Sequence, residues 1–345
     1  MWPSTALSSG PMTKKKARTR NFVAVVLLYL GLATILTSLH GYNVNYGEKA
    51  DKRAARHERI ISLKGESPWA YRLAVPFTAE AVQHALSPLP IPEQDRREAG
   101  YLGVRFLSMF LTFLALHRFQ RFFLPTAWAF GGTVFMAALH GPSFEHYWFQ
   151  PASAPDLMFW TLGAMVTMQG RDRWLFPMLV LGALNRETVV FLIPIHFALR
   201  WGDEPVGRLV ARCALMGIVW LVPFVAVRQV VEVTGWADGK NAIGFLRNNL
   251  TRTEWIAYAI AFAGAWLALP FLGWKHVPPK LRWLILVMGP YLGLILAFGR
   301  IREVRLLLPL GLAFIPAMLC VLKAWDEEAQ APAEPQAPAD AGASS

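Results

Sequence analysis

Long apolar runs alternate along this chain with short polar connections that are mostly basic. A helix that crosses a bilayer needs roughly 20 predominantly apolar residues. Several runs approach that length, and we expect their boundaries to shift by a few residues. The runs cover residues 22–39, 101–116, 124–139, 156–168, 174–199, 213–227, 255–272, 283–298 and 306–322. This pattern predicts an all-α fold, a polytopic transmembrane helical bundle.

Basic residues in the short connections predict the orientation, because cytoplasmic loops carry an excess of Lys and Arg. The first tail, residues 1–21, is strongly basic and is therefore expected in the cytoplasm. The basic connections 117–121, 170–173 and 275–282 are expected on the same side. Counting back from the last of these also places residues 200–212 in the cytoplasm. Both termini are then cytoplasmic, and the run 174–199 begins and ends on one side.

This run of 26 residues cannot cross the membrane twice as full helices, since each would hold only about 13 residues and span about 20 Å. Its acidic and basic side chains, Arg186 and Glu187, lie in its middle, in the sequence NRET. We therefore predict a re-entrant helical hairpin with this tetrapeptide at its tip, added to about eight full spans. The alternative is one long span, which would reverse the side of everything that follows.

The largest predicted outer segment is the loop 40–100. Residues 48–64 are expected to form a charged surface helix, and residues 67–86 an amphipathic helix in the membrane interface. The proline-rich stretch 87–92 ends it. The predicted organisation is a basic tail (1–21), a transmembrane domain (22–323) that includes this loop, and a disordered Ala/Pro-rich cytoplasmic tail (324–345).

Composition agrees with a membrane protein. Apolar residues make up 54% of the chain and charged residues 17%, below the roughly 25% that is usual for soluble domains. The net charge of +11 is explained by basic loops that face anionic lipid head groups, so membrane lipids are the expected partner and nucleic acid is not. Cys213 and Cys320 lie in apolar runs without metal-ligand neighbours, and no metal site is predicted. The sequence has no Gly-rich phosphate loop, no HExxH pair and no GxSxG elbow.

Charged side chains in or near a membrane are costly, so they mark candidate sites. The predicted topology brings many of them to the outer face: Arg72, Glu80, Glu145, His146, Asp156, Arg186, Glu187, Arg300, Arg302, Glu303 and Arg305. Three arginines within six residues, opposite buried acids, are typical of a phosphate clamp beside a general base. The structural alternative is that Arg186 and Glu187 pair with each other or with a neighbouring helix, while Arg300 and Arg305 extend to lipid head groups.

The order of a basic cytoplasmic tail, one span, a large outer loop and many spans with short loops resembles the GT-C superfamily of polyprenyl-phosphate-sugar-dependent glycosyltransferases. The segments that carry the resemblance are WAYRLAVP (69–76), LNRET (184–188) and REVRLLLP (302–309), which are similar to segments of bacterial membrane proteins of that type. The resemblance spans residues 21–323. It implies an inner-membrane enzyme that moves a sugar from a lipid-linked donor to an acceptor on the extracytoplasmic face.

GT-C enzymes generally carry an acid soon after the first span, where this chain has Asn43 and Asn45. The resemblance therefore implies that Glu48, Asp51 or Asp156 is the catalytic base. It implies a donor phosphate held by Arg186 and by the arginines of residues 300–305. The cofactor is left open, with a divalent cation among the alternatives. Two other functions stay open as well: a transporter or flippase for a lipid-linked or anionic solute that binds at a broken helix, and a non-catalytic assembly protein.

Overall fold

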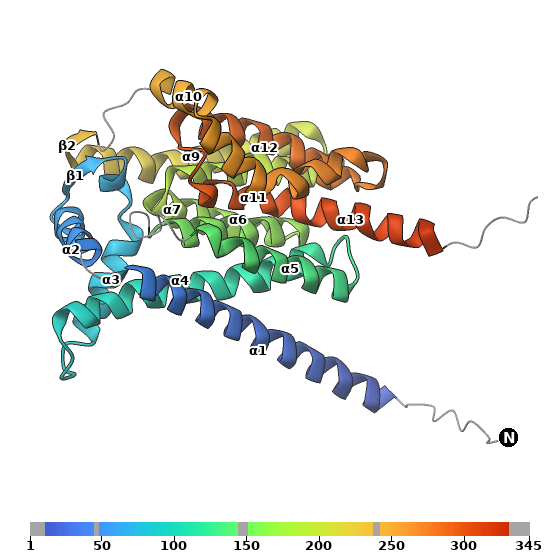
Figure 1. Ribbon diagram of the computed structural model, residues 1–345, viewed down its shortest axis with the longest axis horizontal. Helices are drawn as coiled ribbons and strands as arrows, with labels where there is room; N and C mark the ends of the chain where they lie inside the picture. The colour runs from blue at the N-terminus through green and yellow to red at the C-terminus, as the bar shows by residue number, and fades with distance from the viewer. Residues whose placement is uncertain (1–10, 45–47, 144–150, 237–241, 331–345) are drawn as a thin grey trace, which may run out of the picture.

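The computed structural model describes residues 11–44, 48–143, 151–236 and 242–330. The long helices run roughly along one axis and form a bundle (Figure 1). They are α1 (Pro11–Val44), α4 (Glu93–Gln120), α5 (Thr126–His140), α6 (Ser153–Met168), α9 (Val206–Val230), α11 (Thr253–Leu272), α12 (Pro279–Phe298) and α13 (Gly311–Gln330). Six stretches of the described chain are helical, long and apolar enough to cross a membrane, which identifies an integral membrane protein. Helices α5 and α6, with 15 and 16 residues, are shorter.

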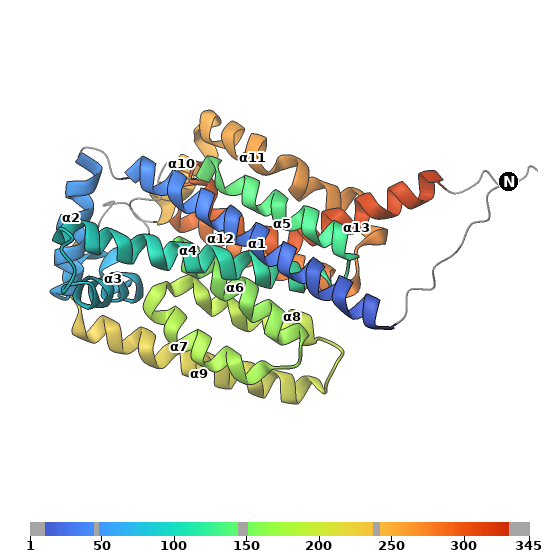
Figure 2. The ribbon, with the colours of Figure 1, turned by 90° about the horizontal axis from the view of Figure 1, so that it is seen from below.

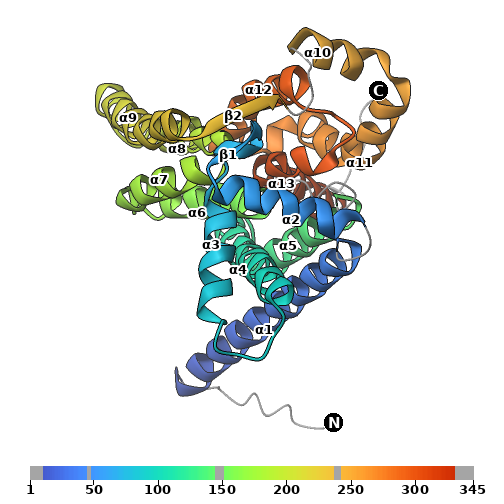
Figure 3. The ribbon, with the colours of Figure 1, turned by 90° about the vertical axis from the view of Figure 1, so that its left-hand side faces the viewer.

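The two ends of the bundle differ. The start of α1 and the end of α13 lie together at one end, which we call the terminal end (Figure 1). The opposite end, the loop end, carries most of the short elements. These are α2 (Glu48–Ile61), β1 (Lys64–Ser67), the 3₁₀ turn η1 (Trp69–Tyr71), α3 (Ala74–Ala85), β2 (Glu232–Trp236) and α10 (Ala242–Thr251). Figure 3 looks onto this end and shows α2 and α3 across the ends of the longer helices.

The loop between α1 and α4 differs from its prediction in two ways. The continuous helix predicted over residues 67–86 is broken, because the chain makes the turn η1 and α3 begins only at Ala74. Pro76 then lies in the first turn of α3, where a missing N–H costs nothing. In addition, β1 pairs in parallel with β2, from Lys64 opposite Glu232 to Ser67 opposite Trp236. This small ladder ties the first loop to the end of α9 and is an addition to the predicted all-α fold.

The apolar run 174–199 is broken where the charged tetrapeptide interrupts it. The turn η3 (Asp172–Trp174) leads into α7 (Leu175–Asn185), and Arg186 is extended, with φ −163° and ψ 141°. The turn η4 (Glu187–Phe191) and α8 (Leu192–Arg200) follow. Both α7 and α8 pack against α6 and α9 (Figure 2). Arg200, at the end of α8, binds Asp172, before the start of α7, with an Nη2–Oδ2 distance of 2.9 Å, so the segment folds back on itself.

Helix α13 is the centre of the bundle. Every residue from Gly311 to Val321 is buried, as expected of a helix that is apolar on all sides. At the periphery, the apolar windows of α1 and α9 are only 17% and 11% buried, which leaves most of their surface to lipid.

The tail was predicted to be disordered from residue 324, and this boundary is wrong, because α13 continues to Gln330. Its last turns are stabilised by two i,i+4 contacts, Lys323 with Glu327 and Gln330 with Asp326. Residues 331–345 lie outside the described residues.

Candidate functional site

A group of charged and polar side chains lies where the first loop, the start of α6, the break after α7 and the loop before α13 meet. We call it the charged cluster. It consists of Arg72, Ser153, Asp156, Arg186, Glu187, Thr188, Glu303 and Arg305. These residues come from four segments that are far apart in the sequence, so the fold alone brings them together.

Residues at the break after α7 bind Asp156, which lies in the first turn of α6. Its Oδ2 accepts a hydrogen bond of 2.7 Å from the Thr188 hydroxyl and lies 3.5 Å from Nη1 of Arg186. Its Oδ1 has no hydrogen-bond partner within the described part of the chain. Only 1% of Asp156 is exposed, and a charged carboxylate buried to this degree requires a cationic partner. Arg186 supplies it because its extended backbone carries the side chain to α6.

Glu187 pairs with a residue of the first loop. Nη2 of Arg72, which directly follows η1, lies 2.6 Å from Oε1 of Glu187. Arg72 thus supplies a counter-charge to the Glu187 carboxylate. Next to this pair, the guanidinium of Arg228 in α9 lies 4.3 Å from the ring centre of Tyr71, so the first loop is fixed both to the break and to α9.

The start of α6 is surrounded by cations. Oγ of Ser153, the first residue of the helix, lies 3.2 Å from Nη1 of Arg305 and 3.5 Å from Nη1 of Arg186. Arg305 belongs to the turn η6 (Val304–Leu306), is 4% exposed and also binds Glu303. The first N–H groups of a helix lack partners inside the helix and favour anions. A helix N-terminus with two guanidinium groups beside it is suited to a phosphate.

Two residues that sequence reasoning missed hold this loop in place. The amide nitrogen of Asn249, in α10, donates to the carbonyl oxygens of Leu296 and Gly299, each at 2.8 Å, and its Oδ1 accepts from the N–H of Ile301 at 3.0 Å. The hydroxyl of Tyr291 donates to the carbonyl of Leu306 at 2.9 Å. Single polar residues within apolar or amphipathic segments give no pattern that would have marked them.

Aromatic rings form an apolar layer close to the charged cluster. The Tyr291 ring lies 4.8 Å from that of Trp160 and 5.2 Å from that of Phe191, measured between centroids. Trp160 is one turn after Asp156 in α6, and Phe191 ends η4. These rings exclude water from the region next to the charged cluster, and this strengthens the electrostatic interactions among its side chains.

The structural alternative for the break agrees with part of the observed arrangement. Arg186 binds Asp156 of the neighbouring helix α6, as that alternative allowed, and Glu187 binds Arg72 of the first loop. By contrast, Arg305 turns inward to Ser153, away from the lipid head groups.

Other predicted site residues lie elsewhere. The guanidinium of Arg302 lies over the Trp255 ring at 5.0 Å, and Arg300 is half-buried in the same loop. Asp51 is exposed on α2, and Glu48 is the first residue of that helix. Oε2 of Glu80 in α3 lies 2.9 Å from Nε2 of His57 in α2, and Nδ1 of His57 lies 3.0 Å from the hydroxyl of Tyr101 in α4. Glu80 therefore belongs to a second network, which joins α2, α3 and α4. Glu145 and His146 lie outside the described residues.

Within the described ranges, no group of three or more His, Cys, Asp or Glu side chains is arranged to hold a metal ion. Searches with protein-family models, against curated proteins and against solved structures return no match for this chain.

Proposed function

We propose that this protein is a membrane glycosyltransferase of the GT-C type, which moves a sugar from a polyprenyl-phosphate donor to an acceptor hydroxyl on the extracytoplasmic face. The observation that carries the proposal is the convergence of Arg186 and Arg305 on Ser153 at the N-terminus of α6, beside the buried Asp156. An anion site next to a carboxylate is the minimum that this reaction requires.

In the proposed orientation the loop end faces the outside of a bacterial inner membrane and both termini are cytoplasmic. The basic connections support it, since residues 117–121, 170–173 and 275–282 all lie at the terminal end, where α1 begins and α13 ends (Figure 1). The segment α7–η4–α8 is then a re-entrant hairpin that enters from the cytoplasmic side, and the other long helices cross the membrane.

In the proposed reaction Arg186 and Arg305 bind the donor phosphate, and the N–H groups at the start of α6 share its charge. The acceptor oxygen attacks the anomeric carbon, and the bond between that carbon and the phosphate oxygen breaks. The lipid phosphate leaves with the bonding electrons, and the arginines stabilise its growing charge. The proton of the acceptor hydroxyl passes to Asp156, whose Oδ2 lies 3.5 Å from Nη1 of Arg186. Glu48 and Asp51 in the first outer loop are the alternative bases.

A transfer assay tests the proposal. Purified protein in liposomes is supplied with radiolabelled polyprenyl-phosphate sugars and a mixture of membrane acceptors, and label that leaves the donor is measured. Asp156→Asn should lower transfer by about 10²–10⁴-fold, the usual contribution of a general base. Glu48→Gln and Asp51→Asn are the parallel arms, because a comparable loss in one of them would move the base to the first loop. Wild-type protein that releases no label from any donor would contradict the proposal.

One observation favours transport as the second candidate. The chain is broken at Arg186, and discontinuous helices often form the binding sites of transporters. A transporter would move a lipid-linked or anionic solute across the liposome membrane without changing it. The same liposomes distinguish the two functions, because only the enzyme separates the sugar from its phosphate.

A further inference from the structure

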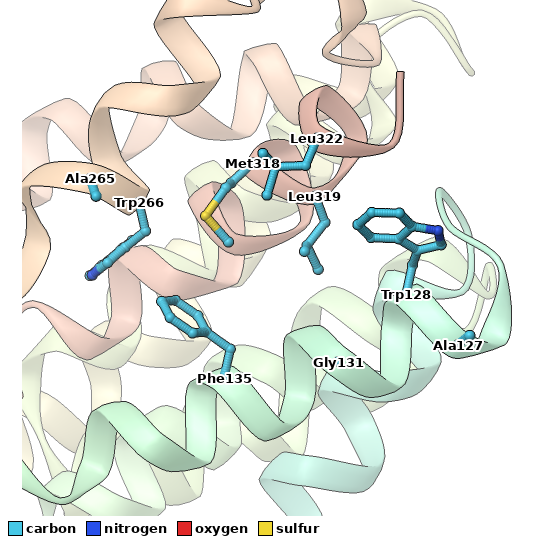
Figure 4. Close-up of a pocket in the computed structure, with 9 residues that line it drawn as sticks. All are labelled: Ala127, Trp128, Gly131, Phe135, Ala265, Trp266, Met318, Leu319 and Leu322. Carbon is cyan, nitrogen blue, oxygen red and sulfur yellow. The ribbon is translucent and has the colours of Figure 1, made fainter. Parts of the chain in front are cut away.

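A second possible binding surface lies far from the charged cluster, in the half of the bundle near the terminal end. It is a groove of about 620 Å³ between α5 and α11, and α13 forms its floor (Figure 4). Its lining is entirely apolar: Ala127, Trp128, Gly131, Phe135, Ala265, Trp266, Met318, Leu319 and Leu322.

Small residues create this groove. A Cβ on Gly131 would meet no atom within 4 Å, and Ala127 and Ala265 add little bulk to the two walls. Trp128 and Phe135 stand on one wall and Trp266 on the other, with the side chains of α13 between them (Figure 4). Both wall helices pack on α13, which closes the groove on its inner side.

We propose that the groove binds one acyl chain of an anionic phospholipid. The only polar side-chain atoms among the nine lining residues are the indole nitrogens of Trp128 and Trp266, and the Trp266 N–H already donates to the carbonyl of Phe262, so ordered water lacks the two to four polar contacts that it needs. From Ala127 to Phe135 the wall of α5 rises about 12 Å, close to the depth of one leaflet in a hydrocarbon core of about 30 Å. A single lipid chain that enters from the terminal end therefore matches the groove in both polarity and length.

The charge around the mouth of the groove selects the head group. The two turns that flank it, residues 117–125 and 273–282, contain five Lys or Arg and no Asp or Glu. Arg121 is exposed in the first of these turns, a few residues before Trp128. Glu328 of α13 lies 3.5 Å from Lys275 and Asp203 lies 2.6 Å from Lys280, so two of these five charges are partly neutralised, whereas no ion pair of Arg121 occurs within the described residues. Arg121 is thus the side chain assigned to the lipid phosphate, and indole groups such as that of Trp128 favour this depth of the membrane.

The test uses full-length protein, purified and stripped of lipid in detergent, with phosphatidylglycerol or phosphatidylcholine added back. Gly131→Phe fills the groove, and Gly289→Phe is the matched control, because Gly289 is exposed on α12 and its Cβ position is equally open. Phosphatidylglycerol should raise the Tm of wild type and of Gly289→Phe by at least about 2 °C more than phosphatidylcholine does. Gly131→Phe should lose this increment.

Arg121→Gln should respond equally to the two lipids, since only the head-group contact is removed. If Gly131→Phe does not fold, Ala265→Leu on the opposite wall replaces it, with native mass spectrometry to count retained lipids. Equal lipid increments in Gly131→Phe and Gly289→Phe would overturn the site. Equal effects of both lipids on wild type would overturn the selectivity for anionic head groups.

Discussion

Glu187 is the side chain on which the charge balance between the first loop and the break depends. Its carboxylate lies 2.6 Å from Arg72, which is 8% exposed. Glu187→Gln removes the carboxylate charge that lies beside the buried guanidinium, and we expect a loss of about 1–3 kcal/mol, because a hydrogen bond between charged groups is replaced by a weaker one. The double change Arg72→Gln with Glu187→Gln should recover much of this loss. Thermal unfolding in detergent measures both, and equal stability of the single variant and wild type would disprove the pairing.

The sequence predicted which charges gather at the site better than it predicted their partners. Arg186, Glu187, Arg305 and Asp156 were selected because charges are costly near a membrane, and the structure places all four in the charged cluster. The partner of each charge depends on backbone conformation at single residues, above all on the extended Arg186. No periodicity in the sequence encodes that conformation.

Helices α3 and α4 approach so closely that one glycine is required between them. A Cβ on Gly100 would lie 2.7 Å from Cα of Ala79, a backbone contact that cannot yield, whereas a Cβ on Gly103 would meet nothing within 4 Å. Gly100→Ala should therefore lower the Tm by separating α3 from α4. Gly103→Ala should leave the Tm unchanged or raise it, because Ala is favoured over Gly in a helix by about 1 kcal/mol. Thermal unfolding should show a lower Tm for Gly100→Ala and no decrease for Gly103→Ala, and equal shifts would contradict the close approach.

Asp172, which precedes α7, binds arginines at the end of α8 and in α9. Its Oδ2 accepts from Arg200 at 2.9 Å and from Arg212 at 2.7 Å, and Arg212 also binds both oxygens of Glu204. Asp172→Asn should cost about 2–4 kcal/mol and speed amide hydrogen exchange through α7 and α8. Glu254→Gln is the control, because its contact with Arg252 is exposed, lies outside this network and contributes about 0–1 kcal/mol. Unchanged exchange in Asp172→Asn would show that packing alone holds the hairpin.

At the level of elements, long apolar runs were predicted well and short loop elements poorly. The helices follow the predicted runs because a membrane span is specified by length and hydropathy alone. The ladder between β1 and β2 joins four and five residues that lie far apart in the chain. Segments this short show no alternation that could be distinguished from a loop.

The proposed topology of the whole molecule depends on the re-entrant hairpin that we propose for residues 174–199. Single cysteines placed after Arg121, Arg173, Arg208 and Lys280 should react with a membrane-impermeant reagent only after the cell is opened. Cysteines at Gly65 and Ser143 should react in intact cells. If the sites after Arg208 and Lys280 both react from outside, residues 174–199 form a single crossing and the proposed orientation of the second half is wrong.

The most direct test of the proposed function is whether the charged cluster recognises a lipid-linked phosphate. We would measure binding of radiolabelled polyprenyl phosphate and of the matching polyprenol to purified protein. Wild type should bind the phosphate at least about tenfold more tightly, because each guanidinium contributes a charge-assisted hydrogen bond worth about 1.5–3 kcal/mol. The variant with Arg186→Gln and Arg305→Gln should bind both lipids with the same affinity, and Arg171→Lys at the terminal end should behave as wild type. Equal affinity of wild type for phosphate and alcohol would contradict the account.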